Sequence, residues 1–381
     1  MIDAQHLLED GRESVGDLLS GWRETGRKMG VWALVPEAEV ERIPEIQAAC
    51  REQNVPLVGS VFPALVSDRG FLNKGIWLLR FNDMPRRFLL PLDPNDGCDG
   101  ENLAEALASL GLDSGQGADA IPTLFIVFDA MLPNIGTHLS VVYDRLGTAV
   151  KYAGVNARSE TFQPMPCLFD QERLFGRGML GLLLPPEASV VAKHGYPVSR
   201  SQMTATSTVG NRIETIDGRP AFEVYRELVR DEYGIDLTEK NFYDYAVHYP
   251  LGLITTLDVV VRIPVALNDD GSLFCVGEVP PDSRLWLLRA PTVQESGCVE
   301  CLANGLEVTN GGSKPEFLLA FYCAGRRMHF GLDDAQEELR QLQARTGTSN
   351  LAGALSLGEI DSLEDLDFPR FHNACVLCAR R

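Results

Sequence analysis

The stretch VWALVPEAEVERIPEIQAACREQNVPLVGSVF, residues 31–62, decides the class of fold. Residues 31–35 form a short apolar run, residues 38–53 have the spacing of a helix, and residues 55–62 form a second, largely apolar run. A strand, a helix and another strand in this order are typical of a sheet whose faces are covered by helices. The stretch therefore predicts an α/β fold.

The same rhythm continues along the chain. Apolar runs predict further strands at residues 123–128, 179–184 and 317–322, with helical patterns between them. The turn sequence Asn268-Asp269-Asp270-Gly271 predicts a hairpin between residues 259–265 and 272–276. At the start of the chain, residues 4–27 have apolar side chains on one broad face, which predicts a helix.

The clearest break in this pattern lies at residues 197–200, near Pro197. We therefore expect two α/β lobes, residues 1–198 and 199–381. Each lobe should contain a mixed sheet flanked by helices. A ligand cleft would lie between the lobes or at the ends of their strands.

The charge balance excludes some classes of partner. The chain has 34 Lys and Arg and 53 Asp and Glu, a net charge of −19, which argues against nucleic acid and against an anionic membrane surface. The first thirty residues lack the basic start and unbroken apolar core of a secretory signal. We expect a cytoplasmic protein, whose nine cysteines would be thiols or metal ligands rather than disulfides.

Two CxxC pairs, Cys298/Cys301 and Cys375/Cys378, are candidates for a metal site. Four converging thiolates would hold zinc or an iron–sulfur cluster, and the sequence does not separate the two metals. The pairs lie 73 residues apart, so the fold would have to bring them together, with Cys323 as an additional candidate ligand. The alternative is that these cysteines are small core residues.

Other motifs are weaker. The GxGxxG pattern at residues 176–181 is followed by Pro185-Pro186, which cannot continue the helix that a dinucleotide site needs, so it predicts a loop before a strand. The chain has no HExxH, GxSxG or Walker A pattern. Arg262 interrupts an apolar strand and Arg326 follows another, positions that suit recognition of an anion as well as ordinary surface charge.

The C-terminal half resembles the FIST family, the sensory F-box and intracellular signal transduction proteins of bacteria. Five segments carry the resemblance in the family's order: His248–Gly252, Val261–Pro264 with Asp270–Leu273, Tyr322–Arg326, Leu357–Ile360 and His372-Asn373. In the N-terminal half, Val58–Pro63 and Pro166–Phe169 resemble further elements. The chain differs from the family at residues 154–159, where Val and Arg replace small residues, and the family's CstaGE pattern is missing at residues 60–65.

The resemblance implies an intracellular sensory protein with an N-terminal and a C-terminal FIST domain. Such a protein would bind a small molecule, and because no output domain remains in the sequence, it would signal to a separate protein. The residues that match the family's motifs imply a ligand site. Arg262 and Arg326 would meet an anionic group, Glu359 and Asn373 would orient it, and Cys323 would lie beside them.

Two alternatives to a simple ligand sensor remain at this point. One is a metal-containing redox protein or enzyme built on the two CxxC pairs. The other is a haem-based gas sensor, a function that the resemblance also implies because some members of the FIST family bind haem. Such a sensor would need an axial ligand to the iron, for which His194, His248 and His372 are candidates. No catalytic residue is assigned.

Overall fold

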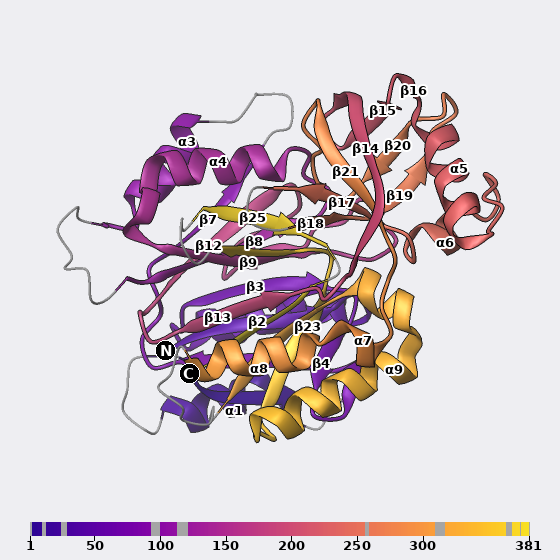
Figure 1. The fold of residues 1–381 in the computed structure, drawn as a ribbon. Helices are drawn as coiled ribbons and strands as arrows, with labels where there is room; N and C mark the ends of the chain where they lie inside the picture. The colour runs from indigo at the N-terminus through magenta and orange to yellow at the C-terminus, as the bar shows by residue number, and fades with distance from the viewer. Residues whose placement is uncertain are drawn as a thin grey trace.

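The computed structural model describes residues 2–9, 13–23, 29–92, 100–112, 121–255, 259–308, 317–362, 368–373 and 375–380. It has an α/β fold with several mixed sheets flanked by helices, which confirms the predicted class (Figure 1). Three six-stranded sheets, here called A, B and C, share one core, and an eight-stranded sheet, D, stands beside them. No helix within these ranges is both long enough and apolar enough to cross a membrane.

Sheet A contains the stretch that decides the fold. Its order is β1 (Ile2–Leu8), β6 (Ile76–Phe81), β2 (Gly30–Pro36), β3 (Leu57–Phe62), β10 (Leu168–Asp170) and β11 (Leu174–Phe175). The strands β2 and β3 are parallel, as the connecting helix α2 (Ile43–Glu52) requires, and the 3-10 helix η1 (Glu37–Arg42) precedes α2. Every residue of β2 and β3 is buried because both faces of the sheet are covered.

Sheets B and C repeat this arrangement. In sheet B the order is β13 (Ser189–Lys193), β26 (Val376–Arg380), β22 (Leu318–Cys323), β23 (Leu351–Ser356), β4 (Leu65–Ser67) and β5 (Gly70–Leu72). In sheet C it is β25 (Pro369–His372), β24 (Glu359–Ser362), β9 (Lys151–Ala157), β8 (Thr123–Asp129), β12 (Gly178–Leu184) and β7 (Arg87–Pro91). The parallel pairs are β22–β23, joined by α9 (Ala324–Thr346), and β8–β9, joined by α4 (Ile135–Leu146) and the 3-10 helix η2 (Gly147–Ala149).

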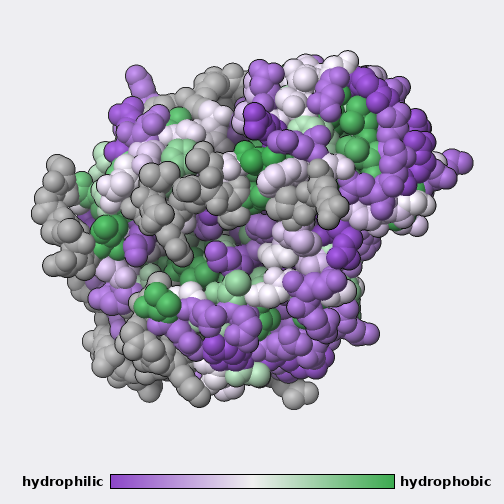
Figure 2. Space-filling view, in the orientation of Figure 1, coloured by the Kyte–Doolittle hydropathy of each residue, from purple (hydrophilic) through white to green (hydrophobic). Residues whose placement is uncertain are grey.

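One aromatic ring from each sheet meets its counterparts at the centre of the core. The ring centroids of Trp32 and Phe125 are 5.3 Å apart, and both rings contact Phe321, at 6.1 and 5.6 Å. Helices cover the outer faces: α3 (Gly100–Ala108) and α4 lie over sheet C, while α8 (Cys298–Val308) and α9 lie over sheet B (Figure 1). Hydrophilic side chains predominate on the outward faces of α8 and α9 (Figure 2).

Sheet D forms the upper right of Figure 1 with its own core. Its order is β18 (Val259–Arg262), β17 (Leu251–Ile254), β21 (Ser283–Leu288), β14 (Val198–Val209), β15 (Arg212–Ile216), β20 (Leu273–Cys275) and β19 (Pro264–Leu267), with β16 (Arg219–Pro220) beside β15. Helices α5 (Ala221–Tyr233) and α6 (Phe242–Ala246) pack against it, and α7 (Val293–Ser296) follows β21. The predicted hairpin is present as β19 and β20, although the predicted strand before it is divided into β18 and β19.

The structure contradicts one sequence prediction about the path of the chain and leaves another as a prediction. The helix predicted over residues 4–27 is wrong at its start, because residues 2–8 form the strand β1, which pairs with β6. Among the described residues of this stretch, Val15–Arg23 form the helix α1. The boundary predicted at residue 198 coincides with the start of β14, but sheets B and C each combine strands from both sides of it. The division into two lobes stays a prediction.

Candidate functional site

A short segment that crosses from sheet C to sheet B carries several of the polar residues that the sequence indicated. It consists of residues 371–373 and 375, which form the end of β25 and part of its connection to β26. His372 and Cys375 line one cavity, whereas Asn373 lines another. The segment, here called the crossing segment, therefore separates two cavities.

The cavity on the His372 side has a volume of about 200 Å³. An apolar cavity of about 150 Å³ accommodates benzene, so this space can hold a small organic molecule. Its walls come from the end of β13, the start of α8, β24 and the crossing segment. The side chains that give it polar character are His194, His372, Asp361, Cys298, Cys301 and Cys375. We call it the histidine–cysteine cavity.

The imidazole of His372 has one nitrogen bound and one without a partner. Its Nε2 lies 3.0 Å from Oδ1 of Asp361, while its Nδ1, although buried, has no hydrogen-bond partner in the part of the chain that the structure describes. The side chain is 2% exposed. Since a carboxylate accepts, Nε2 carries a proton, and Nδ1 is left without a hydrogen-bond partner among the described residues.

Asp361 can hold the His372 ring with its Nε2 directed at the Asp361 carboxylate. Burial alone would raise the pKa of its carboxyl, but His372 and Arg370 outweigh burial and lower the pKa below its ordinary value. The guanidinium of Arg370 lies 3.2 Å from Oδ2. The carboxylate is therefore charged and keeps the His372 ring in a single tautomer.

His194 stacks against His372 with its ring centroid 6.3 Å away and an interplanar angle of 28°. Its Nδ1 accepts from the backbone N–H of Tyr196 at 3.0 Å, so Nε2 is the protonated nitrogen and donates to the carbonyl of Val259 at 3.1 Å. Both nitrogens of this neutral ring are occupied. His194 and His372 both line the cavity, and of the two rings His372 has the nitrogen without a described partner.

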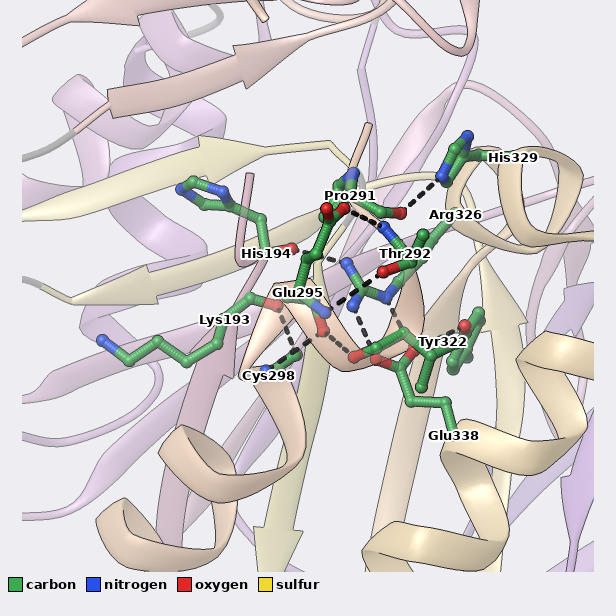
Figure 3. Close-up of polar contacts among 12 residues, drawn as sticks. Lys193, His194, Pro291, Thr292, Glu295, Cys298, Tyr322, Arg326, His329 and Glu338 are labelled. Atoms are coloured by element: carbon green, nitrogen blue, oxygen red, sulfur yellow. Dashed lines mark hydrogen bonds and ion pairs between the residues drawn. The ribbon is translucent and has the colours of Figure 1, made fainter. Parts of the chain in front are cut away.

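Arg326, a predicted ligand residue, does not line the cavity; its guanidinium lies between the backbone of His194 and the side chain of Glu338 (Figure 3). It is 0% exposed, and its guanidinium donates to both carboxylate oxygens of Glu338, at 2.8 and 2.6 Å. Its Nη1 donates to the carbonyl oxygen of His194 at 2.5 Å. Burial would lower the pKa of Arg326, but Cys298 and Glu338 raise it above its ordinary value.

Arg262 supports the crossing segment from the other side. Its Nη1 donates to the carbonyl of Phe371 at 2.7 Å and its Nε to the carbonyl of Glu278 at 2.9 Å, and the guanidinium lies over the Phe371 ring. Burial lowers the pKa of Arg262 to about 10. No ion pair joins Arg262 to a carboxylate of the described residues.

Glu359 and Cys323 hold the far end of the crossing segment. The Glu359 carboxyl accepts from the backbone N–H of Cys375 at 3.1 Å and from the Ser356 hydroxyl at 2.5 Å. The backbone N–H of Cys323 donates to the carbonyl of Cys375 at 3.1 Å. Burial raises the pKa of Glu359 to about 8.

Asn373 fixes the middle of the segment to sheet D, because its Oδ1 accepts from the backbone N–H of Ile263 at 3.0 Å. Cys323 and Asn373 also line the second cavity, which is small, about 40 Å³, and mostly apolar. The five residues predicted to bind a ligand are thus brought together around the crossing segment. Arg326 and Glu359 contact backbone groups of two lining residues, whereas Arg262 contacts the carbonyl of Phe371, next to the lining residue His372. None of these three side chains lines the histidine–cysteine cavity.

The four cysteines predicted to bind a metal are placed unequally. Cys298, Cys301 and Cys375 line the histidine–cysteine cavity, whereas Cys378 packs in the hydrophobic core of sheet B. Within the described ranges, no group of three or more His, Cys, Asp or Glu side chains has a geometry that could hold a metal ion. The predicted zinc or iron–sulfur site gains no support from this arrangement.

Sequence analysis did not predict that His194, His372 and Asp361 lie together in one cavity. His194 and His372 were singled out separately as axial ligands for haem, and Asp361 not at all. The third candidate, His248, lies elsewhere, with its Nδ1 2.7 Å from Nδ1 of His329. The usable signal was the polar residue Asp361 two positions after Glu359 in a short strand, since alternate residues of a strand share a face.

Comparison with known families gives two matches that together span most of the chain. The model of the FIST N domain matches residues 31–219, and the model of the FIST C domain matches residues 221–362. A search of curated proteins finds no match. The second match includes Arg262, Cys323, Arg326 and Glu359, and ends before the crossing segment.

Proposed function

The chain belongs to the FIST family, whose domains are associated with sensory signal transduction, and we propose that it senses a small polar molecule bound in the histidine–cysteine cavity. The volume of about 200 Å³ suits a molecule of few heavy atoms. A separate signalling protein would read the bound state. The family membership supports the sensory role, and the cavity supports the choice of site.

The observation that carries this proposal is the free Nδ1 of His372. A buried polar atom without a hydrogen bond costs about 1–3 kcal/mol, so such atoms are rare unless a ligand or water satisfies them. Asp361 holds the ring so that this nitrogen remains available. A ligand that forms a hydrogen bond with Nδ1 would recover the lost free energy.

The arrangement of the walls suggests how binding becomes a signal. The cavity joins the end of β13, the start of α8 and the crossing segment, and the last of these connects sheets B and C. A ligand that contacts all three would favour one relative position of these elements. Such differential binding shifts a conformational equilibrium, which a partner protein can recognise.

Mass spectrometry of the small molecules released from purified, denatured protein would test this proposal. The informative variant is His372→Gln, because the glutamine amide can still donate to Asp361 while the nitrogen at the Nδ1 position is removed. The matched control is His138→Gln. His138 is also buried with an Nδ1 that lacks a described partner, but it lies on α4, away from the cavity.

We expect one compound to co-purify with the wild type and with the His138 variant. The amount of this compound released from the His372 variant should be at least tenfold lower. A tenfold loss corresponds to about 1.4 kcal/mol of binding free energy, which is within the range for one buried hydrogen bond. Equal release from all three proteins would show that the cavity is not the binding site. Absence of any released compound, followed by failure of calorimetric titration with a metabolite extract, would contradict ligand binding.

A further inference from the structure

The first CxxC pair lies in the first turn of a helix. Cys298 is the first residue of α8, and the backbone N–H of Cys301 donates to the carbonyl of Gly297 at 3.1 Å, which closes the turn. Residues three positions apart on a helix are neighbours, with Cβ atoms about 5–6 Å apart. Both residues line the histidine–cysteine cavity, as does His372.

The two thiols differ in accessibility. Cys301 is exposed, whereas Cys298 is 1% exposed and its Sγ donates to the carbonyl of Lys193 at 3.4 Å (Figure 3). Burial raises the pKa of the Cys298 thiol to about 12, so it stays protonated at neutral pH. A reagent from solution therefore meets Cys301 first, and Cys298 is positioned behind it.

We propose that Cys298 and Cys301 form a thiol–disulfide couple that low-molecular-weight disulfides, such as oxidised glutathione, convert to an intramolecular disulfide. The Cys301 thiol loses its proton, and the resulting thiolate attacks one sulfur of the reagent and forms a mixed disulfide. The reagent thiolate that is released takes up this proton. The sulfur of Cys298 then attacks Sγ of Cys301 and releases the second reagent thiol, which takes the Cys298 proton. The protein loses two electrons and two protons, and the reagent disulfide gains them as two thiols.

The second CxxC pair lacks these features and provides an internal comparison. Cys375 precedes the strand β26 and Cys378 lies within it, and both are buried. Their side chains face different surroundings, the cavity for Cys375 and the core of sheet B for Cys378. Neither thiol of this pair is exposed as Cys301 is, so a reagent from solution has no first point of attack there.

Disulfide formation would also change the cavity wall. A disulfide needs Cβ atoms about 3.5–4.5 Å apart, which is closer than the helical spacing. The first turn of α8 would have to tighten. Gly297, which precedes this turn with a φ of 56° and no atom near the position of a Cβ, is the residue whose backbone can adjust. The proposal does not depend on which molecule the cavity holds.

The experiment treats fully reduced protein with oxidised glutathione and follows each cysteine by differential alkylation and peptide mass. In the wild type we expect the peptide with both residues to lose two hydrogen atoms and to carry no glutathione. In Cys298→Ser, glutathione should remain on Cys301 because nothing displaces it. In Cys301→Ser, Cys298 should stay reduced, and Cys375→Ser should behave as the wild type.

Two results would overturn the proposal. One is full alkylation of Cys298 and Cys301 in wild-type protein after exposure to the oxidant. The other is a glutathione adduct that persists on Cys301 of the wild type, because Cys298 would then not be within reach. The wild-type result decides the question even if a serine variant fails to fold, and it is independent of ligand release from the His372 variant.

Discussion

Arg326 forms a two-pronged ion pair with Glu338 across a break in helix α9. The two residues lie on either side of Gly331, whose φ of 76° and ψ of 171° interrupt the helix. Both side chains are buried, and the hydroxyl of Tyr322 also donates to Glu338 at 2.7 Å. The pair therefore joins both parts of α9 to β22 and, through the carbonyl of His194, to the cavity wall.

Replacement of Glu338 should destabilise the fold strongly. In Glu338→Gln the Arg326 guanidinium would remain buried without a counter-charge, which costs about 3–5 kcal/mol in the free energy of unfolding. Urea denaturation followed by circular dichroism measures this loss. The control is the adjacent Glu337→Gln, whose ion pair with Arg340 is exposed, and which should change stability by less than about 0.5 kcal/mol. Equal effects of the two variants would contradict the importance of the buried pair.

Glu359 should make stability depend on pH. Its pKa rises from an ordinary 4.5 to about 8 in the folded protein because of burial. Between these values the folded chain keeps a proton that the unfolded chain has lost, so stability falls as pH rises towards 8 and then levels. Glu359→Gln stays neutral, and its stability relative to wild type should grow across this range, at up to about 1.4 kcal/mol per pH unit.

Urea denaturation of both proteins at several pH values would measure this difference. The glutamine amide can accept from the Cys375 N–H and donate to Ser356, so the local contacts are preserved in the variant. A difference in stability that does not vary between pH 5 and 8 would mean that the folded carboxyl titrates normally.

Arg262 should act on the cavity through the backbone that it supports. Arg262→Met would leave the carbonyls of Phe371 and Glu278 without their donor, at a cost of about 1–3 kcal/mol for each buried group. If the proposed function holds, ligand retention should fall more than tenfold, although the guanidinium does not line the cavity. Thermal denaturation and mass spectrometry of released compounds measure the two effects. Arg284→Met, at an exposed position of β21, is the control and should change neither.

Predictions from local sequence patterns were correct where residues close in the sequence determine the structure. Residues 31–62 form the predicted strand, helix and strand, and the hairpin around Asn268–Gly271 is present because its turn residues favour a tight reversal. The predicted helix over residues 4–27 failed for the opposite reason. The apolar residues of 2–8 fit a strand as well as a helix, and pairing with β6, about seventy residues away, decides between them.

The sequence by itself determined the α/β class, the strand–helix–strand unit of residues 31–62 and the FIST family, because periodicity and short motifs are properties of neighbouring residues. Only the tertiary structure decided which polar side chains face a cavity. Arg326 meets Glu338 and the His194 carbonyl, and Arg262 meets the Phe371 carbonyl, so both cations are occupied while His372 keeps a free nitrogen. The alternation of side chains along a strand shows which residues share a face. The segment that packs against this face comes from a distant part of the sequence, and it supplies the hydrogen-bond partners that buried polar groups need.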